Sequence, residues 1–272
     1  MKPGALLGRG ILTTLLVALP VLAQAADPPG LEDFLSGLRV RDVAISPDGQ
    51  YLSMIGIQDG HSRVLVVDRT AKSGPRPLLS AQDEDKYTPS WCGWANATRL
   101  LCGFRAIGSD RGKFYAITRL LAINADGSNL IQITNRRSAI GGQFEDTILD
   151  WTPSDPNTVL LEVDEGSETS MLGGSVDVVG GYADGYPTVY AVDVNSGKRK
   201  IAQRERPPIA HFVTDGQGVA RLGYGFRKDE ILYFGRLEGA DGWRELKRIK
   251  AFESDDDFTP VAAIAGSNFA YA

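Results

Sequence analysis

A sequence pattern that predicts a strand, a tight turn and a second strand recurs along the chain, and it limits the possible folds more than any other feature. Its first copy runs from Val43 through the turn Ser46-Pro47-Asp48-Gly49 to Ile55. Asp-Gly suits such a turn because glycine adopts positive φ and aspartate bonds its own backbone. The opening turns of the copies lie near residues 48, 97, 155, 216 and 267, at intervals of 49, 58, 61 and 51 residues.

This period predicts a β-propeller, because a four-stranded blade takes about 40–50 residues and loops lengthen it. Each unit continues after its first hairpin with further strands, as at Tyr115–Asn124 and Leu130–Thr134. The Gly-rich stretch from Gly166 to Tyr186 is expected to be a loop insertion in the third unit. A β-sandwich is the alternative, since it also has short strands at regular spacing. The recurring strand–turn–strand pattern favours an all-β propeller, with about four and a half blades and an incomplete ring, over a sandwich.

Cys92 and Cys102 are the only cysteines. A hairpin centred on residue 97 pairs positions whose numbers sum to 194, so the two cysteines are expected to lie directly opposite each other. Such a pair without mutual hydrogen bonds has Cα atoms about 4.5 Å apart, which a disulfide accepts. We predict that Cys92 and Cys102 form a disulfide, and two buried thiols are the alternative.

The first 25 residues have the order of a secretory signal peptide. Lys2 and Arg9 are followed by an uncharged apolar run from Ile11 to Leu22, and Ala23-Gln24-Ala25 offers a cleavage site. A membrane anchor is the alternative, but this run is shorter than the roughly 20 residues that span a bilayer. The sequence therefore predicts an exported protein, periplasmic or secreted, without membrane contact after cleavage.

Residues 26–42 are predicted to form a lead-in with a short helix over about 31–38, and residues 43–272 to form the propeller. The helix is expected because apolar residues recur there at helical spacing. The formal net charge of −5 and 23% charged residues describe a mildly acidic globular chain. This balance argues against a nucleic-acid partner.

Few residues are arranged for catalysis or metal binding. The nearest look-alike of a nucleophile elbow, Gly60-His61-Ser62-Arg63-Val64, lacks the small last residue that a strained elbow needs and is expected to be a loop. His211, the only other histidine, lies in a strand-like run and is expected to be a core or edge residue. The acidic runs at residues 83–85 and 255–257 lack a calcium-loop pattern. We predict no catalytic, cofactor-binding or metal-binding residue and no cofactor.

The four tryptophans are open to two interpretations. They could line a peptide groove, or they could fill blade cores and the seams between blades, where large rings bury most area. Trp94 and Trp151 precede equivalent turns in successive units, which favours a structural role. The tryptophans are Trp91, Trp94, Trp151 and Trp243.

Four stretches carry a resemblance to a known family: Val43–Leu52 with its Ser-Pro-Asp-Gly turn, Thr188–Gly197, Val213–Arg221 and the acidic Ser254–Pro260. They resemble the propeller of prolyl oligopeptidase family serine peptidases, and most closely the bacterial dipeptidyl aminopeptidase and acylaminoacyl peptidase branch. The resemblance covers nearly all of residues 31–272. Ser-Pro-Asp-Gly also marks propellers of the TolB type, which carry no enzyme.

The resemblance implies a propeller of seven or eight blades over a C-terminal α/β-hydrolase with a Ser-Asp-His triad. Since the sequence stops within the fifth unit, it implies the truncated propeller portion alone, which is not an enzyme as it stands. Its role would be to gate the hydrolase or select its peptide substrates, with a hydrolase domain or a peptide as partner. A stand-alone TolB-like periplasmic scaffold that binds proteins is the alternative.

An open arc also implies uncovered blade edges. Apolar residues near the last edge, Val261, Ile264, Phe269 and Tyr271, favour self-association. The rival arrangement is a closed ring in which the segment Val40–Ile45 completes the last blade.

Overall fold

The structure is a computed structural model that describes residues 40–58, 60–71, 74–79, 87–110, 112–133, 144–152, 154–163, 186–237, 239, 242–251 and 258–272. The predicted signal peptide, the predicted helix over 31–38, the acidic runs and nearly all of the predicted insertion lie outside these residues. All described residues belong to one compact unit that begins at Leu38. Every regular element in this part is a strand, so it contains no helix long and apolar enough to cross a membrane.

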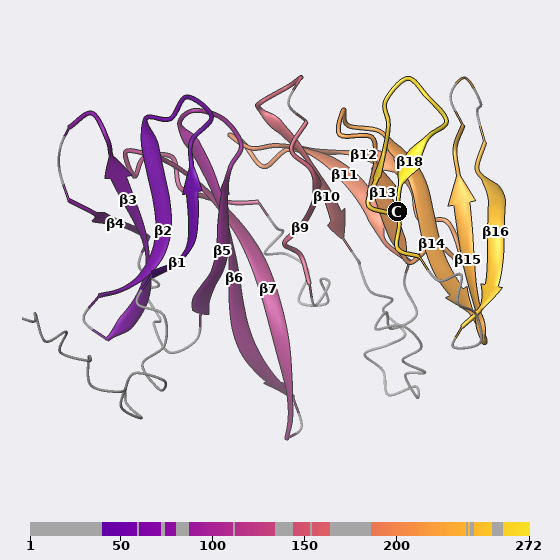
Figure 1. Ribbon diagram of the computed structural model, residues 1–272. Coiled ribbons are helices and arrows are strands. Elements are labelled where there is room, and N and C mark those ends of the chain that lie inside the picture. Colours follow the sequence, from indigo (N-terminus) through magenta and orange to yellow (C-terminus); the bar gives the residue numbers. More distant parts are fainter. Residues whose placement is uncertain are drawn as a thin grey trace, which may run out of the picture. The chain divides into compact units, whose positions relative to one another are not determined.

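Four four-stranded sheets follow one another along the chain, and a hairpin follows them (Figure 1). Blade 1 holds β1 (Val40–Ile45), β2 (Tyr51–Gln58), β3 (His61–Asp68) and β4 (Arg76–Leu79). Blade 2 holds β5 (Tyr87–Trp94), β6 (Arg99–Asp110), β7 (Lys113–Asn124) and β8 (Ile131–Gln132). Blade 3 holds β9 (Thr147–Asp150), β10 (Thr158–Val163), β11 (Thr188–Asp193) and β12 (Arg199–Gln203). Blade 4 holds β13 (His211–Thr214), β14 (Ala220–Arg227), β15 (Glu230–Gly235) and β16 (Arg244–Lys250), and the terminal hairpin holds β17 (Ala262–Ala263) and β18 (Ala270–Tyr271).

In each sheet the strands lie side by side in chain order and pair antiparallel, which is the meander of a propeller blade. The prediction of an all-β propeller with four blades and part of a fifth is therefore confirmed. Among the described strands β17 pairs only with β18, and β1 pairs only with β2. The rival arrangement, in which the segment 40–45 completes the last blade, is therefore wrong. The first described strand, β1, starts at Val40.

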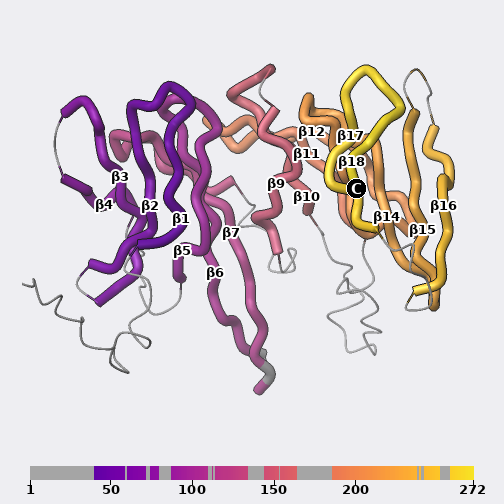
Figure 2. Tube along the Cα trace, viewed as in Figure 1, coloured from indigo at the N-terminus to yellow at the C-terminus, as the bar shows by residue number. Residues whose placement is uncertain are grey.

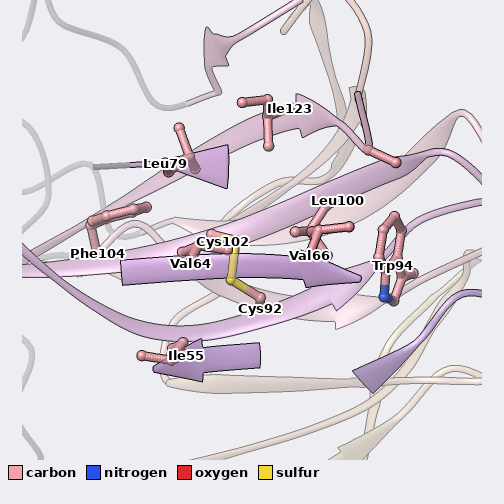
Figure 3. Close-up of a cluster of buried hydrophobic side chains, with 11 residues drawn as sticks. Ile55, Val64, Val66, Leu79, Cys92, Trp94, Leu100, Cys102, Phe104 and Ile123 are labelled. Carbon is pink, nitrogen blue, oxygen red and sulfur yellow. A yellow bond between two sulfur atoms is a disulfide. The ribbon is translucent and has the colours of Figure 1, made fainter. Parts of the chain in front are cut away.

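The core lies in the seams between successive blades. Sheet residues alternate between two faces, so one strand supplies both the seam before its blade and the seam after it. In β6, Leu100 and Cys102 enter the cluster shared with blade 1, whereas Leu101 enters the cluster shared with blade 3. Figure 3 shows the first cluster, where Ile55 and Val64 from blade 1 lie near the residues of blade 2. A third cluster joins blades 3 and 4 around Phe212.

The two ends of the blades differ. One end, called here the turn end, carries tight turns in which an Asp or Asn side chain accepts a backbone N–H two residues later. At the first turn Asp48 accepts from Gln50 N at 3.1 Å, and Gly49 has a φ of 74°. The same bond recurs at Asp68, Asn96, Asp126, Asp155, Asp193 and Asp215. The five opening turns predicted from the sequence are confirmed.

The opposite end, called here the loop end, carries connections of very different length. Blades 1 and 4 close there with tight turns between β2 and β3 and between β14 and β15. In blade 2 the β6–β7 hairpin extends well beyond the neighbouring strands (Figure 2). In blade 3 the residues 164–187 separate β10 from β11. Hydrogen bonds across a seam connect the turn end of one blade to the turn end of the next. For example, Asn96 Nδ2 in blade 2 donates to Pro156 O in blade 3 at 3.0 Å. Neighbouring blades therefore point their turn ends in the same direction.

The long β6–β7 hairpin was not expected, since the sequence pattern predicts strands over only Arg99–Phe104 and Tyr115–Asn124. The ladder continues to the pair Asp110 and Lys113. Gly108 permits this continuation because the ring of Tyr115 lies across it, and a Cβ on Gly108 would be 2.6 Å from that ring. The predicted strands near residues 130–134, 260–265 and 269–272 are instead reduced to two residues each.

Candidate functional site

Blade 4 carries a row of polar and aromatic side chains across the middle of its sheet, one from each of its strands. His211 pairs with Tyr224, Tyr224 with Tyr233, and Tyr233 with Lys247 across the four strands. The His211 and Tyr224 rings lie 5.0 Å apart between centroids, and the Tyr224 and Tyr233 rings 6.3 Å. We call these four residues, with Phe258, the aromatic row.

Phe258 extends the row beyond the sheet. Its ring stacks on Tyr233 at 4.3 Å, and its carbonyl oxygen accepts a hydrogen bond from the Tyr233 hydroxyl at 2.8 Å. The Lys247 ammonium lies 5.4 Å from the Phe258 ring centroid, within the range of a cation–π contact. The row therefore combines stacked ring faces with a cation.

Glu162 of β10 supplies a carboxylate at one end of the row. Its side chain is only 6% exposed, and it accepts the backbone N–H of Phe212 at 3.0 Å. Its other oxygen lies 3.7 Å from Nδ1 of His211, which is 37% exposed. Burial first, and then the charge of Glu162, raise the pKa of Tyr224 above its ordinary value. Tyr224 therefore keeps its proton at neutral pH and remains a hydrogen-bond donor.

Other acidic side chains at the blade seams are held by structural bonds. Asp42, which has a φ of 54°, accepts the backbone N–H of Cys92, and Asp150 accepts that of Gly218 at 2.9 Å. Asp146 accepts from the indole of Trp91 at 3.0 Å and from the hydroxyl of Thr118. Each carboxylate ties one blade to a neighbouring segment. Within the described ranges, no group of three or more His, Cys, Asp or Glu residues could hold a metal ion.

The structure joins Cys92 and Cys102 by a disulfide. The two residues are direct partners in the β5–β6 ladder, and their Cα atoms lie 4.1 Å apart. This agrees with the register deduced from a turn centred on residue 97. Both residues are buried in the first seam, where Figure 3 shows the bond between their sulfurs. Their role is therefore structural.

The elbow look-alike at residues 60–64 is not a loop, contrary to expectation. Gly60, with a φ of 82°, lies in the turn, and His61 begins β3, where Ser62 pairs with Ile57. The turn is tight because the ladder continues to the pair Gln58 and His61. His211 begins β13 as the strand-like pattern predicts. The two histidines belong to blades 1 and 4.

The tryptophans lie in the seams, as their positions predict. Trp94 is buried in the first cluster, and its indole donates to Ala44 O at 3.3 Å. Trp91 and Trp151 pack edge to face in the second cluster, with centroids 6.4 Å apart. Trp243 packs on Phe212 in the third.

The aromatic row was not anticipated from the sequence, although its register can be deduced there. In the hairpin that turns at Lys228-Asp229, partners sum to 457, which pairs Tyr224 with Tyr233. No sequence pattern predicts that Glu162 lies beside the row. Glu162 precedes Phe212 by 50 residues and accepts its backbone N–H across a seam.

The repeated four-stranded sheets and the seams between them define the chain as a β-propeller protein.

A scan of protein families finds none that matches the chain, and a search of curated proteins finds no match. Solved structures that match the chain include TolB from Acinetobacter baumannii, at 13% identity and a TM-score of 0.35 over 71% of this chain and 39% of that chain. An acylaminoacyl peptidase from Pyrococcus horikoshii shows 14% identity and a TM-score of 0.38, over 73% of this chain and 28% of that one. A prolyl endopeptidase shows 13% identity and a TM-score of 0.48, over 78% and 30%. The chain thus spans about two fifths or less of these proteins.

Proposed function

We propose that this chain is the non-catalytic propeller portion of an exported serine peptidase of the prolyl oligopeptidase family, and that it selects peptides for a hydrolase domain. The observation that carries the proposal is the difference between the two blade ends. One end is closed by repeated tight turns, whereas the other bears the long β6–β7 hairpin and the 164–187 connection. The aromatic row crosses the sheet of blade 4 between these two ends. Binding residues commonly lie on variable connections that a rigid scaffold positions.

The aromatic row suits a short peptide. Ring faces such as those of Tyr224 and Phe258 take apolar side chains and peptide planes, while the Tyr224 hydroxyl and the Lys247 ammonium offer donors. A peptide presents its carbonyl oxygens and its carboxylate to such donors. The row therefore supplies contact area and orientation, and the chemistry of bond cleavage belongs to the partner domain.

Peptide binding tests this proposal directly. Calorimetric titration of the folded chain with peptides of about five to ten residues should show binding, and Tyr224→Leu should weaken it about fivefold, which corresponds to about 1 kcal/mol. Leu130→Ala, an exposed apolar residue at the turn end of blade 2, is the control and should leave affinity unchanged. Equal loss in both variants, or no binding by the folded chain, would count against the proposal.

The chain by itself is expected to be inactive. A fluorophosphonate probe should not label it, and aminoacyl and peptidyl chromogenic substrates should not be hydrolysed. Covalent labelling of any serine in this chain would contradict the non-catalytic role.

A stand-alone TolB-like scaffold is the second candidate, because the Ser46–Gly49 turn of blade 1 suits both classes. The coding DNA after codon 272 separates the two. An open frame that continues into a Gly-x-Ser-x-Gly stretch supports the peptidase, whereas a stop codon in an intact gene supports the scaffold.

A further inference from the structure

The last strand of blade 3 is a sheet edge with a high density of positive charge. Among the described strands, β12 pairs only with β11. The segment 198–206, which contains β12, carries five cations and one acid, although the formal net charge of the chain is −5. The acid, Glu205, accepts a hydrogen bond from the Thr188 hydroxyl at 3.4 Å. The five cations are all exposed, and they are Lys198, Arg199, Lys200, Arg204 and Arg206.

Cations flank this edge on both faces of the sheet. In β11, Tyr190 faces the cluster shared with blade 2, and Ala191 faces the cluster shared with blade 4. Their partners in β12 are Ile201 and Lys200, which therefore lie on the same two faces. Arg199, two residues before Ile201, shares the face of Ile201. Because blades pack on each other through their faces, the edge itself takes no part in a seam.

The backbone of β12 is oriented to accept another strand. At the turn, Asp193 N donates to Lys198 O at 2.9 Å, which makes these residues a hydrogen-bonded pair. Hydrogen-bonded and non-hydrogen-bonded pairs alternate along an antiparallel ladder, so the pair Tyr190 and Ile201 is non-hydrogen-bonded. The N–H and C=O groups of Ile201 therefore point away from β11. Ile201 is 44% exposed.

An extended acidic peptide fits this edge better than two other anionic or strand-forming partners. A strand added beside β12 has side chains on both faces, where carboxylates meet cations in cross-strand pairs. A second copy of β12 would place like charges opposite each other, which disfavours pairing between copies. A lipid surface is flat and would meet the cations of one face only.

We propose that blade 3 binds an extended acidic segment of a partner protein as a fifth strand along β12. The partner backbone bonds to the N–H and C=O groups of Ile201, and its carboxylates lie beside Lys200 and Arg204. Backbone bonds supply affinity in this mode of recognition, and the flanking side chains supply selectivity. This edge belongs to blade 3, so the inference does not depend on peptide binding by the aromatic row of blade 4.

Fluorescence polarisation with a labelled, capped peptide Glu-Thr-Glu-Val-Glu-Thr-Glu tests the charge requirement at about 50 mM salt, where screening is weak. The wild type should bind this peptide and should not bind the peptide with lysine in place of each glutamate. The double variant Lys200→Glu with Arg204→Glu should bind about tenfold more weakly, because attractive cross-strand pairs become repulsive. The matched control, Arg227→Glu with Lys228→Glu, makes the same charge change at exposed positions of blade 4 and should bind as the wild type does.

Two substitutions at Ile201 test the backbone contact. Ile201→Pro removes the N–H that points away from β11, a place where a sheet edge tolerates proline. Ile201→Ala shortens the side chain but keeps the N–H. With wild-type circular dichroism in both, the proline variant should bind about fivefold more weakly than the alanine variant. If the proline disturbs the fold, hydrogen exchange of the Ile201 amide in the wild type decides, because the bound peptide should slow it.

Four results would overturn the proposal. They are no binding by the folded wild type, equal loss in the two charge-reversed double variants, equal affinity of the two Ile201 variants with unchanged amide exchange, and binding to phosphatidylglycerol vesicles in place of the peptide. The last result would assign the edge to a lipid surface. Tyr224→Leu should bind the acidic peptide as the wild type does, which separates this outcome from that of the proposed function.

Discussion

Arg99 shows how one residue connects two blades. It is buried beside the opening turn of blade 2, where its Nε donates to Val194 O of blade 3 at 2.9 Å. Its Nη1 donates to Asn129 O at 2.7 Å and to the Asn124 side chain at 3.0 Å. Burial lowers the pKa of this guanidinium, while the charge of Asp193 acts in the opposite direction. Arg99 stays protonated because the guanidinium group is in effect always charged in proteins.

Replacing Arg99 should therefore cost much of the stability of the second seam. Arg99→Met leaves buried carbonyl oxygens without donors, and we expect a loss of about 3 kcal/mol in the free energy of unfolding. Arg99→Lys should recover less than half, because one ammonium cannot reproduce the fork of donors. Urea denaturation measures the free energy of unfolding of both variants, and Arg204→Met, which changes an exposed residue, is the control. A loss in Arg99→Met no larger than in the control would contradict this role.

At the scale of the element, the turn end depends on side-chain acceptors. Asp193 accepts from Ser196 N at 2.7 Å and Ser196 Oγ at 2.8 Å, and from Asn195 N at 3.1 Å. The bond from the Ser196 side chain is the first cause that holds the Asp193 pKa below its ordinary value. The pKa values of Asp48, Asp68 and Asp126 are lowered in the same way.

Lowered pKa values predict the direction of acid destabilisation. Because the folded pKa of Asp193 lies below the unfolded value of about 3.9, its contribution is present above that pH and is lost as pH falls through the folded pKa. Asp193→Asn keeps an acceptor for the turn but does not titrate. The difference in urea midpoint between wild type and this variant should therefore shrink between pH 6 and pH 3. A constant difference over that range would contradict the assignment.

Seams also constrain individual glycines. The ring of Trp151 lies against Gly93 across the second seam, and a Cβ at Gly93 would be 2.6 Å from it. Gly93→Ala should therefore displace the ring and destabilise the fold by about 1–3 kcal/mol. Gly242→Ala is the matched control, because a Cβ there meets nothing within 4 Å. Thermal denaturation compares the two, and equal melting temperatures would show that the seam adjusts freely.

At the scale of the whole molecule, stability comes from repetition of one seam. Each cluster takes residues from two successive blades, so each inner blade is stabilised from both sides. Blade 1 and the terminal hairpin each keep an apolar face that the described residues leave exposed.

The sequence by itself determined the features that depend on neighbours along the chain. Asp-Gly and Asn turns, strand alternation and the 49- to 61-residue period predicted the class of fold and the five opening turns. The pairing of Cys92 with Cys102 followed from one turn centre. Such features are encoded locally, because a turn sets the register of the two strands beside it.

Only the tertiary structure determined which side chains and backbone groups contact each other across the seams. Arg99 reaches a carbonyl 95 residues away, and Glu162 meets the N–H of Phe212 50 residues away. The length of the β6–β7 hairpin likewise escaped the pattern, because its outer part carries mixed, exposed residues without a clear apolar alternation. These contacts depend on how blades pack against each other, and no local preference of the chain encodes that packing.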